Sequence, residues 1–310
     1  MAKIFRSIHK DACYPKGSVV CIGAFDGVHV GHQALIKHTV ARAKQHNLPS
    51  IAVSFDPLPK EFFCQHTIPR LSTLRDKLQT LFAHGIDAVL LLRFNQSLAN
   101  LTAEEFILRI LKQRLATREL WTGTDFRFGR GRCGNVDMLS EIGPKQGFHA
   151  YTIAPVFVGQ QRVSATTIRH MLAHGQLMQV RQFLARPYTI SGRVVYGRQL
   201  ARTLGYPTAN ISFAYTPALT GVYAVYVRNV QSQPWPAIAH FGGRPTFGQM
   251  QTVLEVHLFD FQGDLYHHHL AVEFVAKVRD VCTFANTAAL QTQIQRDSAE
   301  ARALLSASAP

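Results

Sequence analysis

The sequence has few cysteines, few acidic residues and no long apolar run. Its five cysteines are scattered and form no CxxC pair, whereas a disulfide framework or a structural zinc site needs paired spacing. We therefore expect reduced, partly buried thiols. The densest apolar stretch, 88–92, is far shorter than the roughly 20 residues of a membrane span, and the start has no signal-peptide segment. These absences predict a cytoplasmic protein without a membrane segment.

Acidic residues are outnumbered, because 33 Lys and Arg residues face 19 Asp and Glu residues and give a formal net charge of +14. Such a surplus attracts polyanions, including both nucleic acids and nucleotide phosphates. A nucleic-acid site would gather basic residues on one element or interleave them with aromatic residues, but here they are spread along the whole chain. We expect small phosphorylated ligands and no specific nucleic-acid partner. A basic nucleic-acid-binding protein stays open as the alternative of a different class.

The length of 310 residues exceeds the roughly 100–200 residues of one domain, and the sequence pattern changes near residue 187. Before this point, short apolar runs alternate with helical periods, which is typical of a parallel α/β sheet. After it, β-branched and aromatic runs recur without helices between them, which is typical of an antiparallel barrel or sandwich. We predict a Rossmann-like α/β domain over 1–186 and a small, mainly β barrel domain with a C-terminal helix over 187–310.

The individual elements follow from the same periodicities. In the first part we expect strands at 19–25, 51–55, 88–94, near Leu120 and at 150–158, and helices at 31–47, 74–84, from 103, at 166–173 and at 177–184. In the second part we expect strands at 188–195, 222–227, 236–241, 253–259 and 271–278, and a last helix at 287–305.

The segment GAFDGVHVGHQALI, at 23–36, is the strongest functional signal. An expected strand leads into a glycine-containing turn, and a helix begins at about Gly31. Backbone N–H groups at a helix N-terminus bind phosphate, and the helix dipole adds to the attraction. His29 and His32 lie three residues apart, so both imidazoles can face the phosphate and stabilise the charge that develops in nucleotidyl transfer. The alternative is an ordinary strand–helix connection with two incidental histidines.

This segment resembles the HxGH nucleotidyltransferase superfamily, and its FDGVH wording is similar to that of the bacterial bifunctional riboflavin kinase/FAD synthetases. The resemblance implies that both histidines are catalytic. It also implies that the surrounding residues bind ATP, namely Gly23, Phe25, Asp26 and Gly31.

Two later segments extend the resemblance. VSATTIRHML is similar to the second signature of the superfamily, which implies that Ser164, Thr166 and Arg169 contact the ATP phosphates. In TGTDF, the resemblance implies that Asp125 and Phe126 shape the flavin side of the adenylylation site. A literal GxGxxG at 129–134 lies too late in the α/β part for a dinucleotide fingerprint, with no acidic residue at the expected distance.

The segment GRVVYGRQLARTLGYPTANI, at 192–211, looks like the riboflavin kinase signature with its PTAN core. The resemblance implies that Thr208 and Asn210 hold Mg²⁺ and the ATP phosphates, since hard oxygen ligands suit a hard cation. It also implies an ATP- and flavin-binding flap and turn made of Gly192, Gly197, Gly205 and Pro207. The alternative for PTAN is a turn between two strands.

Glu255 is the general base that this resemblance implies, taking the proton from the 5′-hydroxyl of riboflavin. The alternative is a surface glutamate on a strand; apolar neighbours on both sides favour catalysis, because an unpaired carboxylate among them would be costly. Three departures from the family pattern, at Ala201, His240 and Val281, leave open an enzyme with one working activity.

The resemblance covers roughly 19–297, with both motif sets in the family's order. It implies conversion of riboflavin and ATP to FMN and ADP in the C-terminal domain. It implies conversion of FMN and ATP to FAD and pyrophosphate in the N-terminal domain, with Mg²⁺ in both steps. We expect riboflavin, FMN and ATP as partners and a monomer or weak homo-oligomer. The adjacent histidines at 267–269 would point to alternate faces of a strand, so we expect solvated side chains rather than a metal site.

Overall fold

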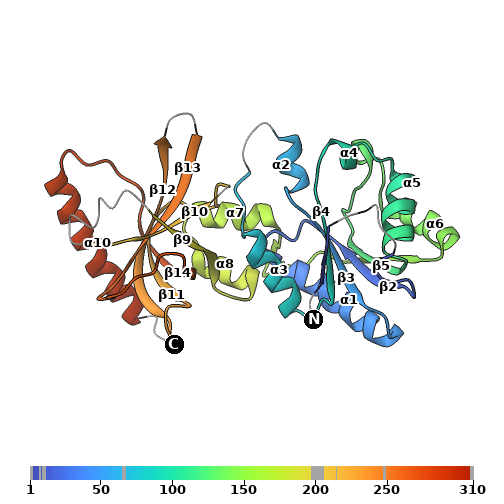
Figure 1. The fold of residues 1–310 in the computed structure, drawn as a ribbon, viewed down its shortest axis with the longest axis horizontal. Coiled ribbons are helices and arrows are strands. Elements are labelled where there is room, and N and C mark those ends of the chain that lie inside the picture. Colours follow the sequence, from blue (N-terminus) through green and yellow to red (C-terminus); the bar gives the residue numbers. More distant parts are fainter. Residues whose placement is uncertain are drawn as a thin grey trace. The chain divides into compact units, whose positions relative to one another are not determined.

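The computed structural model describes residues 3–6, 8, 12–64, 68–196, 206–213, 215–246 and 249–307 (Figure 1). The chain divides into two compact units, Met1–Ile68 with Lys77–Ser164 and Pro69–Asp76 with Ala165–Pro310. Each unit is described by itself below. The domain boundary expected between residues 186 and 187 stays a prediction. The compact units are divided differently, since the helices over 165–173 and 177–184 belong to the second unit.

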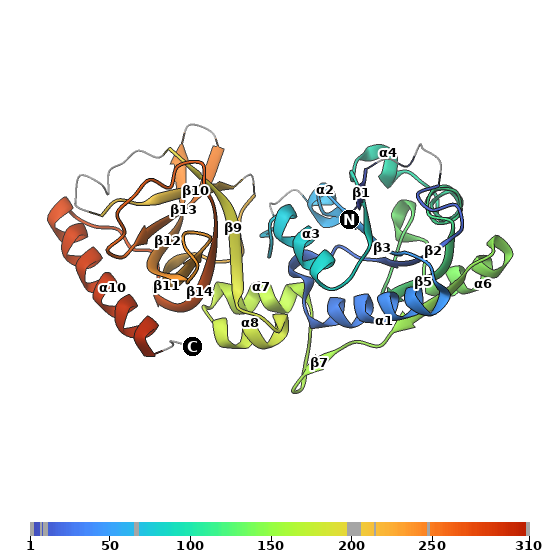
Figure 2. The same cartoon turned by 60° about the horizontal axis from the view of Figure 1, so that its bottom comes forward.

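The first unit contains a six-stranded, wholly parallel sheet in the order β1-β4-β3-β2-β5-β6. Strands β2, β3 and β4 are buried along their whole length, which agrees with their mainly apolar sequences. Helix α1 runs along one face of the sheet against β2, β3 and β5 (Figure 2). The strands are β1 (Lys3–Phe5), β2 (Ser18–Ile22), β3 (Ser50–Phe55), β4 (Ala88–Leu92), β5 (Thr117–Gly123) and β6 (His149–Ile153).

The helices of the first part close the core of this sheet. Phe106, Ile107 and Ile110 of the π-helix η2 are buried with Val20 and Leu90 of the strands. The helical elements are η1 (Asp26–Val28), α1 (Val30–His46), α2 (Pro59–Phe63), α3 (Leu74–Ala83), α4 (Gln96–Ala99), α5 (Ala103–Glu105), η2 (Phe106–Arg114), η3 (Arg130–Arg132) and α6 (Val136–Gln146). The short strands β7 (Phe157–Val158) and β8 (Gln161–Arg162) form a separate hairpin.

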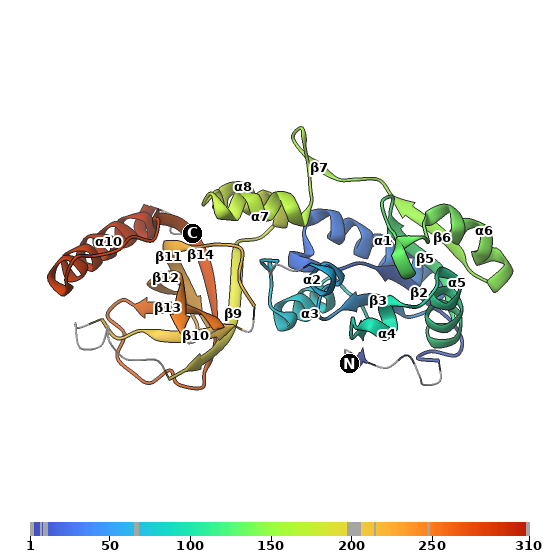
Figure 3. The same cartoon turned by 90° about the horizontal axis from the view of Figure 1, so that it is seen from above.

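The second unit is a closed barrel in the order β10-β13-β12-β11-β14-β9, with all described pairs antiparallel. Helices α7 and α8 lie side by side, and α8 contacts β9 and β14 (Figure 3). Helix α10 packs on the outside of the barrel through Ala301 and Leu305, and Asp297 fixes it to Arg279 of β14 at 2.7 Å. The elements are α7 (Ala165–Ala173), α8 (Leu177–Leu184), β9 (Tyr188–Val195), β10 (Ala209–Phe213), β11 (Gly221–Arg228), β12 (Trp235–Thr246), β13 (Gln249–Leu258), β14 (His269–Arg279) and α10 (Thr287–Ala307).

The predicted fold class is confirmed in both units, but some local predictions were wrong and some elements were missed. The strand expected at 150–158 is instead β6 and the separate strand β7, which pairs with β8. The strand expected to reach Phe25 ends at Ile22, because Phe25 takes a left-handed backbone conformation with φ 50°. Strand β10 was not expected, although alternating residues such as Ile211 fill the barrel interior.

Candidate functional site

The strand order places β2 at the point where the direction in which strands are added to the sheet reverses. From β2 the chain builds β3 and β4 on one side, and then returns to build β5 and β6 on the other. In open parallel sheets, ligands bind beyond the carboxyl ends of the strands at such a reversal. Strands β2 and β5 are paired neighbours, and they run directly into the predicted segments 23–36 and 123–126. The topology therefore puts both segments at one end of the sheet.

The turn between β2 and α1 has an unusual backbone. Phe25, Gly27 and Val28 all have positive φ values, of 50°, 74° and 41°. Val28 is β-branched, so this conformation is energetically unfavourable and needs support from its surroundings. The Gln33 side chain provides some of that support by donating to the Val28 carbonyl at 2.9 Å. Strain of this kind is concentrated at functional sites, and the identity of Val28 gave no sign of it in the sequence.

His29 is the N-cap of helix α1. Its Nδ1 accepts a hydrogen bond from the backbone N–H of His32 at 3.3 Å, so a neutral His29 carries its proton on Nε2 and remains a donor there. The first-turn N–H groups of Val30 and Gly31 have no acceptor within their own helix. A Cβ atom on Gly31 would lie 3.2 Å from two atoms of the His29 ring. Gly31 therefore allows the ring to lie against the helix start.

His32 stacks on His29, with ring centroids 3.7 Å apart and planes inclined by 14°. Phe25 contacts His32 edge-on at a centroid distance of 5.1 Å. Within the described part of the chain, Nδ1 of His32 is buried and has no hydrogen-bond partner. Burial, together with the neighbouring His29 and Lys77, holds the pKa of His32 well below its usual range, so this imidazole is neutral at pH 7. The structure thus brings the two predicted histidines together.

A buried lysine that sequence analysis missed lies beside this turn. Lys77 of α3 is 4% exposed, and its Nζ donates to the carbonyls of Phe55 at 2.9 Å and Ala24 at 3.4 Å. Phe55 is the last residue of β3, and Ala24 follows β2. A signal was available in the sequence, since Lys77 lies four residues before the fully buried Leu81 on the core-facing side of its helix.

The two predicted flavin-side residues have different surroundings. Asp125 is exposed and forms an ion pair with Arg162 of β8. Phe126 is half-buried and stacks on Phe128, with centroids 5.5 Å apart and planes inclined by 15°. Both residues follow β5 at the carboxyl end of the sheet, as expected from the topology. Their contact with a flavin stays a prediction.

The glycines of the GxGxxG segment have a packing role. A Cβ atom on Gly129 would lie 2.8 Å from the backbone of Ala103, and Gly129 has a φ of 73°. A Cβ atom on Gly134 would lie 2.8 Å from the ring of Phe128. Close approach of backbone and side chains explains these two glycines without a dinucleotide.

The residues of the second signature lie around the start of α7. Ser164 directly precedes the helix, and Thr166 is in its first turn, so the hydroxyl groups are at a helix N-terminus as expected. Arg169 lies one turn further, and its Nε donates to the carbonyl of Pro69 at 2.6 Å. The contacts of these three residues with ATP stay a prediction.

The register of the barrel brings three residues of interest into one row. Asn210 of β10 pairs with Glu255 of β13, and Glu255 pairs with His240 of β12. Directly opposed residues on neighbouring strands point to the same face. The Glu255 carboxylate lies 3.7 Å from Nδ1 of His240, and the two side chains are 17% and 42% exposed.

The apolar neighbours of Glu255 have a different meaning from the one inferred from the sequence. Leu254 and Val256 are fully buried and alternate with Glu255 along β13, so they point into the barrel while Glu255 points outward. The carboxylate is therefore not buried among them, and the cost of an unpaired charge does not bear on its role. Its position beside Asn210 and His240 is what distinguishes it from an ordinary surface glutamate.

The PTAN residues lead into β10 rather than forming only a turn. Asn210 is 8% exposed, and its Nδ2 donates to the carbonyl of Thr208 at 3.2 Å. The side-chain carbonyl oxygen of Asn210 is the group left for a cation or a donor. The carbonyl of Pro207 lies 2.9 Å from Nδ1 of His257 on β13, which holds the segment against that strand.

The predicted flap glycines are only partly covered by the structure. Gly192 lies within β9, and a Cβ atom there would lie 2.3 Å from Cγ2 of Ile211. Barrel packing alone therefore requires a glycine at this position. Gly197 and Gly205, like Ala201, lie outside the described residues, and their role in a flap stays a prediction.

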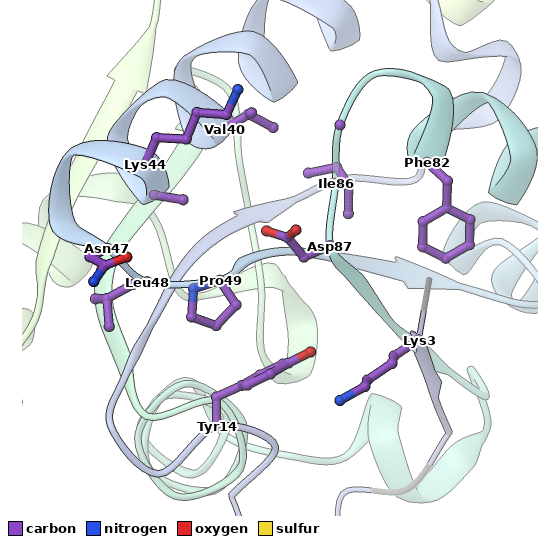
Figure 4. A pocket seen from close by; sticks show the side chains of 12 residues that line it. Lys3, Tyr14, Val40, Lys44, Asn47, Leu48, Pro49, Phe82, Ile86 and Asp87 are labelled. Carbon is purple, nitrogen blue, oxygen red and sulfur yellow. The ribbon is translucent and has the colours of Figure 1, made fainter. Parts of the chain in front are cut away.

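A hollow of about 660 Å³ in the first unit lies away from the predicted residues (Figure 4). Its lining includes Lys3, Tyr14, Asn47 and Asp87, around the end of α1 and the amino ends of β3 and β4. Ligands of parallel sheets bind at the carboxyl ends instead. Among the described residues, no three His, Cys, Asp or Glu side chains gather in a way that could hold a metal ion.

Two family models match the chain, and they follow each other in the same order as the two motif sets. Residues 11–167 match the family model for FAD synthetase, and residues 184–305 match the family model for riboflavin kinase. The bifunctional riboflavin kinase/FMN adenylyltransferase of Pseudomonas fluorescens is 43% identical over 309 residues, covering 99% of each chain. The enzymes of the same name from Escherichia coli K12 and Haemophilus influenzae are 40% and 37% identical, and each alignment covers 97% of this chain.

One solved structure has a similar fold over nearly the whole chain. A crystal structure from Streptococcus pneumoniae, described as a macrolide-efflux protein, has a TM-score of 0.78 at 27% identity and covers 97% of this chain and 98% of its own. In the present protein, none of the described helices combines the length and the apolar character needed to cross a membrane. The likeness supports the arrangement of elements found here.

Proposed function

Because the chain belongs to the family of bifunctional riboflavin kinase/FMN adenylyltransferases, we propose that its two motif sets divide the family's two reactions between them. The protein phosphorylates riboflavin to FMN and adenylylates FMN to FAD. The proposal assigns the 23–32 segment to adenylylation and the row around Glu255 to phosphorylation. It also keeps the domain boundary between residues 186 and 187, which falls just after the start of the riboflavin kinase match at 184.

Adenylylation needs donors placed around a phosphate. A phosphate oxygen of FMN attacks the α-phosphate of ATP, and pyrophosphate leaves, so no covalent enzyme intermediate is required. The first-turn N–H groups of α1 and Nε2–H of His29 are donors for the charge that grows on the phosphates. His32 supports this arrangement as a neutral ring stacked on His29. The ATP side of the site is formed by Gly23, Phe25, Asp26 and Gly31.

Two further groups complete this proposed site. Ser164, Thr166 and Arg169 bind the ATP phosphates, since hydroxyl groups at a helix start and a guanidinium are suited to phosphate oxygens. Asp125 and Phe126 contact the flavin, supported by their position at the carboxyl end of β5.

Phosphorylation of riboflavin needs a base and an anchored nucleotide. We assign to Glu255 the removal of the proton from the 5′-hydroxyl, whose oxygen then attacks the γ-phosphate of ATP while ADP leaves. The carboxylate is partly exposed on the outer face of the barrel, so a substrate hydroxyl can reach it. Its neighbours in the row, Asn210 and His240, keep it beside the PTAN segment.

The oxygen groups of the PTAN segment fit a magnesium ion. The side-chain oxygens of Thr208 and Asn210 are hard ligands, and the hydrogen bond from the Asn210 amide leaves its oxygen available. When bound there, Mg²⁺ would neutralise charge on the ATP phosphates during transfer. Pro207, Gly192, Gly197 and Gly205 belong to the nucleotide and flavin side of the proposal.

The proposal is completed by partners and location. Small-molecule substrates are the expected partners, with no specific nucleic acid, in a cytoplasmic monomer or weak homo-oligomer. The spread of basic residues along the chain supports this view of the +14 charge. Sedimentation tests the oligomeric state, and filter binding at about 150 mM salt tests the nucleic-acid alternative, since nonspecific attraction weakens steeply with salt.

The observation that carries the proposal is the capped and stacked His29–His32 pair at the carboxyl end of β2. The test is to incubate the protein with ATP, Mg²⁺ and either riboflavin or FMN, and to separate the flavins by chromatography. We expect His32→Ala to reduce FAD formation about 10²–10³-fold and Glu255→Ala to reduce FMN formation about 10²–10⁴-fold. Each change should spare the other reaction.

Exposed residues of the same type provide the matched controls. His38→Ala on α1 and Glu300→Ala on α10 should leave both rates unchanged. If His32→Ala or Glu255→Ala stops both reactions in a folded protein, the assignment of the motif sets is wrong.

A further inference from the structure

Lys77 is a charged residue on the buried face of its helix, α3. It is 4% exposed on the same face of α3 as Leu81, which is fully buried. Removing an ammonium group from water is costly unless polar groups replace its hydration. Two backbone carbonyls do so in part, Phe55 at 2.9 Å and Ala24 at 3.4 Å. A methionine or leucine would fill this place at less cost, so the charge itself requires an explanation.

The two carbonyls lie where β2 and β3 end, at the nucleotide end of the sheet: Phe55 is the last residue of β3, and Ala24 follows β2. Ala24 precedes the strained turn that carries His29, and its carbonyl also accepts a hydrogen bond from Oγ of Ser54 at 3.2 Å. One residue earlier, the N–H of Gly23 donates to the carbonyl of Val53 at 3.1 Å. The beginning of the turn is therefore fixed to β3 by two bonds, and Lys77 adds a third connection from a helix.

The charge of Lys77 also reaches the histidine pair. Burial has the largest effect on the low pKa of His32, followed by the neighbouring His29 and then Lys77. The groups that bear on His32 thus come from the loop before α1 and from α3, while Asp26 lies in the preceding turn and is itself buried. A fixed cation at this end of the sheet also favours the binding of phosphate.

We propose that Lys77 is a positioning residue of the adenylyltransferase reaction, whose buried ammonium ties the carboxyl ends of β2 and β3 together and so fixes the turn that presents His29 and His32 to the nucleotide. This inference rests on the proposed role of the histidine pair. Lys77 acts through that turn, and its charge adds to the effects of burial and of His29 on the low pKa of His32. A misplacement of about 1 Å in such a group costs roughly 10²-fold in rate.

The test compares Lys77→Met, which keeps the shape and removes the charge, with Lys77→Arg, which keeps the charge. Lys145→Met, on the exposed face of α6, is the matched control. FAD formation from FMN and ATP is measured from about pH 8.5 down to the lowest pH at which the protein stays folded. Thermal unfolding of the same preparation reports folding, and FMN formation from riboflavin reports the other reaction. We expect Lys77→Met to lose about 10²-fold in FAD formation and to keep its FMN formation.

The pH profile separates positioning from a general loss of structure. Without the Lys77 charge, the pKa of His32 rises, so in Lys77→Met the acid limb of FAD formation moves to higher pH. Lys77→Arg and Lys145→Met should keep the limb of the unaltered protein. If Lys77→Met loses both activities, the same measurement is made on Lys77→Gln. We then expect the acid limb of its FAD formation to lie at higher pH than in the unaltered protein.

Two results would overturn the inference: an unchanged FAD rate in Lys77→Met, or an acid limb that stays in place when the charge is removed. His32→Ala, measured beside these variants, separates this inference from the proposed site. Loss of FAD formation in His32→Ala but not in Lys77→Met rejects the role of Lys77 alone. Retention of FAD formation in His32→Ala rejects the proposed site as well.

Discussion

Replacing Gly31 by alanine tests whether the close fit between His29 and the helix start matters for FAD formation. The added Cβ atom would lie 3.2 Å from Cε1 and Nδ1 of His29, whereas carbon atoms pack comfortably at about 3.5–4.0 Å. The ring must therefore shift by a few tenths of an ångström, and its bond to the His32 N–H, already 3.3 Å long, weakens. Since a misplacement of about 1 Å costs roughly 10²-fold, we expect Gly31→Ala to lower the FAD rate by about 3- to 10-fold.

The same substitution should act in the opposite direction on stability. Alanine is favoured over glycine inside a helix by about 0.5–1 kcal/mol, so the unfolding temperature should stay the same or rise. Ala34→Gly is the matched control, because it removes this helix stabilisation from α1 without adding an atom near His29. The assays are flavin chromatography for both reactions and thermal unfolding. An unchanged FAD rate in Gly31→Ala, or an equal loss in Ala34→Gly, would refute the reasoning.

Two further predictions concern stability. Gly192→Ala should destabilise the barrel by about 1–3 kcal/mol, the usual cost of overpacking, because the new Cβ would lie 2.3 Å from Ile211; urea unfolding followed by loss of FMN formation measures this. Glu119→Gln tests the ion pair between Arg42 and Glu119 in the first unit. Burial alone would raise the pKa of Glu119, but hydrogen bonds from Arg42, Trp121 and His46 lower it to about 2. A carboxyl group with a lowered pKa stabilises the folded state above its ordinary value near 4.5 and loses this effect as the pH falls towards 2. Thermal unfolding should therefore show Glu119→Gln less stable at pH 7, with the difference shrinking towards pH 2, and a constant difference would contradict the pairing.

Periodicity predicted the layers of both units but not every element. Buried runs such as Ile51–Phe55 and the helix Leu177–Leu184 are set by local apolar pattern, and the structure has them at or within one residue of the predicted bounds. The failures occur where a tertiary contact decides the conformation. Strand β10 is short and Pro207 lies just before it, so its formation depends on pairing with β9 and β13 in the barrel. That information is not contained in a local window.

The two proposed sites differ in how much of them could be read from the sequence. His29 and His32 are three residues apart, so a single turn and helix bring them together and the motif itself predicts their proximity. Asn210, Glu255 and His240 come from three strands, and only the barrel register places them in one row. Lys77 was missed for a third reason. A lysine on an amphipathic helix normally marks the solvent side, and the carbonyls that accept its hydrogen bonds, of Ala24 and Phe55, are distant in the sequence.

The row of Asn210, Glu255 and His240 also bears on the alternative that only one of the two activities works. Among the three departures from the family pattern, Val281 is 52% exposed, and Arg279 nearby is bound by Asp297 at 2.7 Å. His240 is the departure that adjoins the proposed base, 3.7 Å from Glu255. A positive charge on His240 would stabilise the carboxylate and weaken it as a base. The amide of asparagine carries no charge, so we expect His240→Asn to raise the FMN rate and to leave the FAD rate unchanged. An unchanged FMN rate would show that His240 does not influence the base.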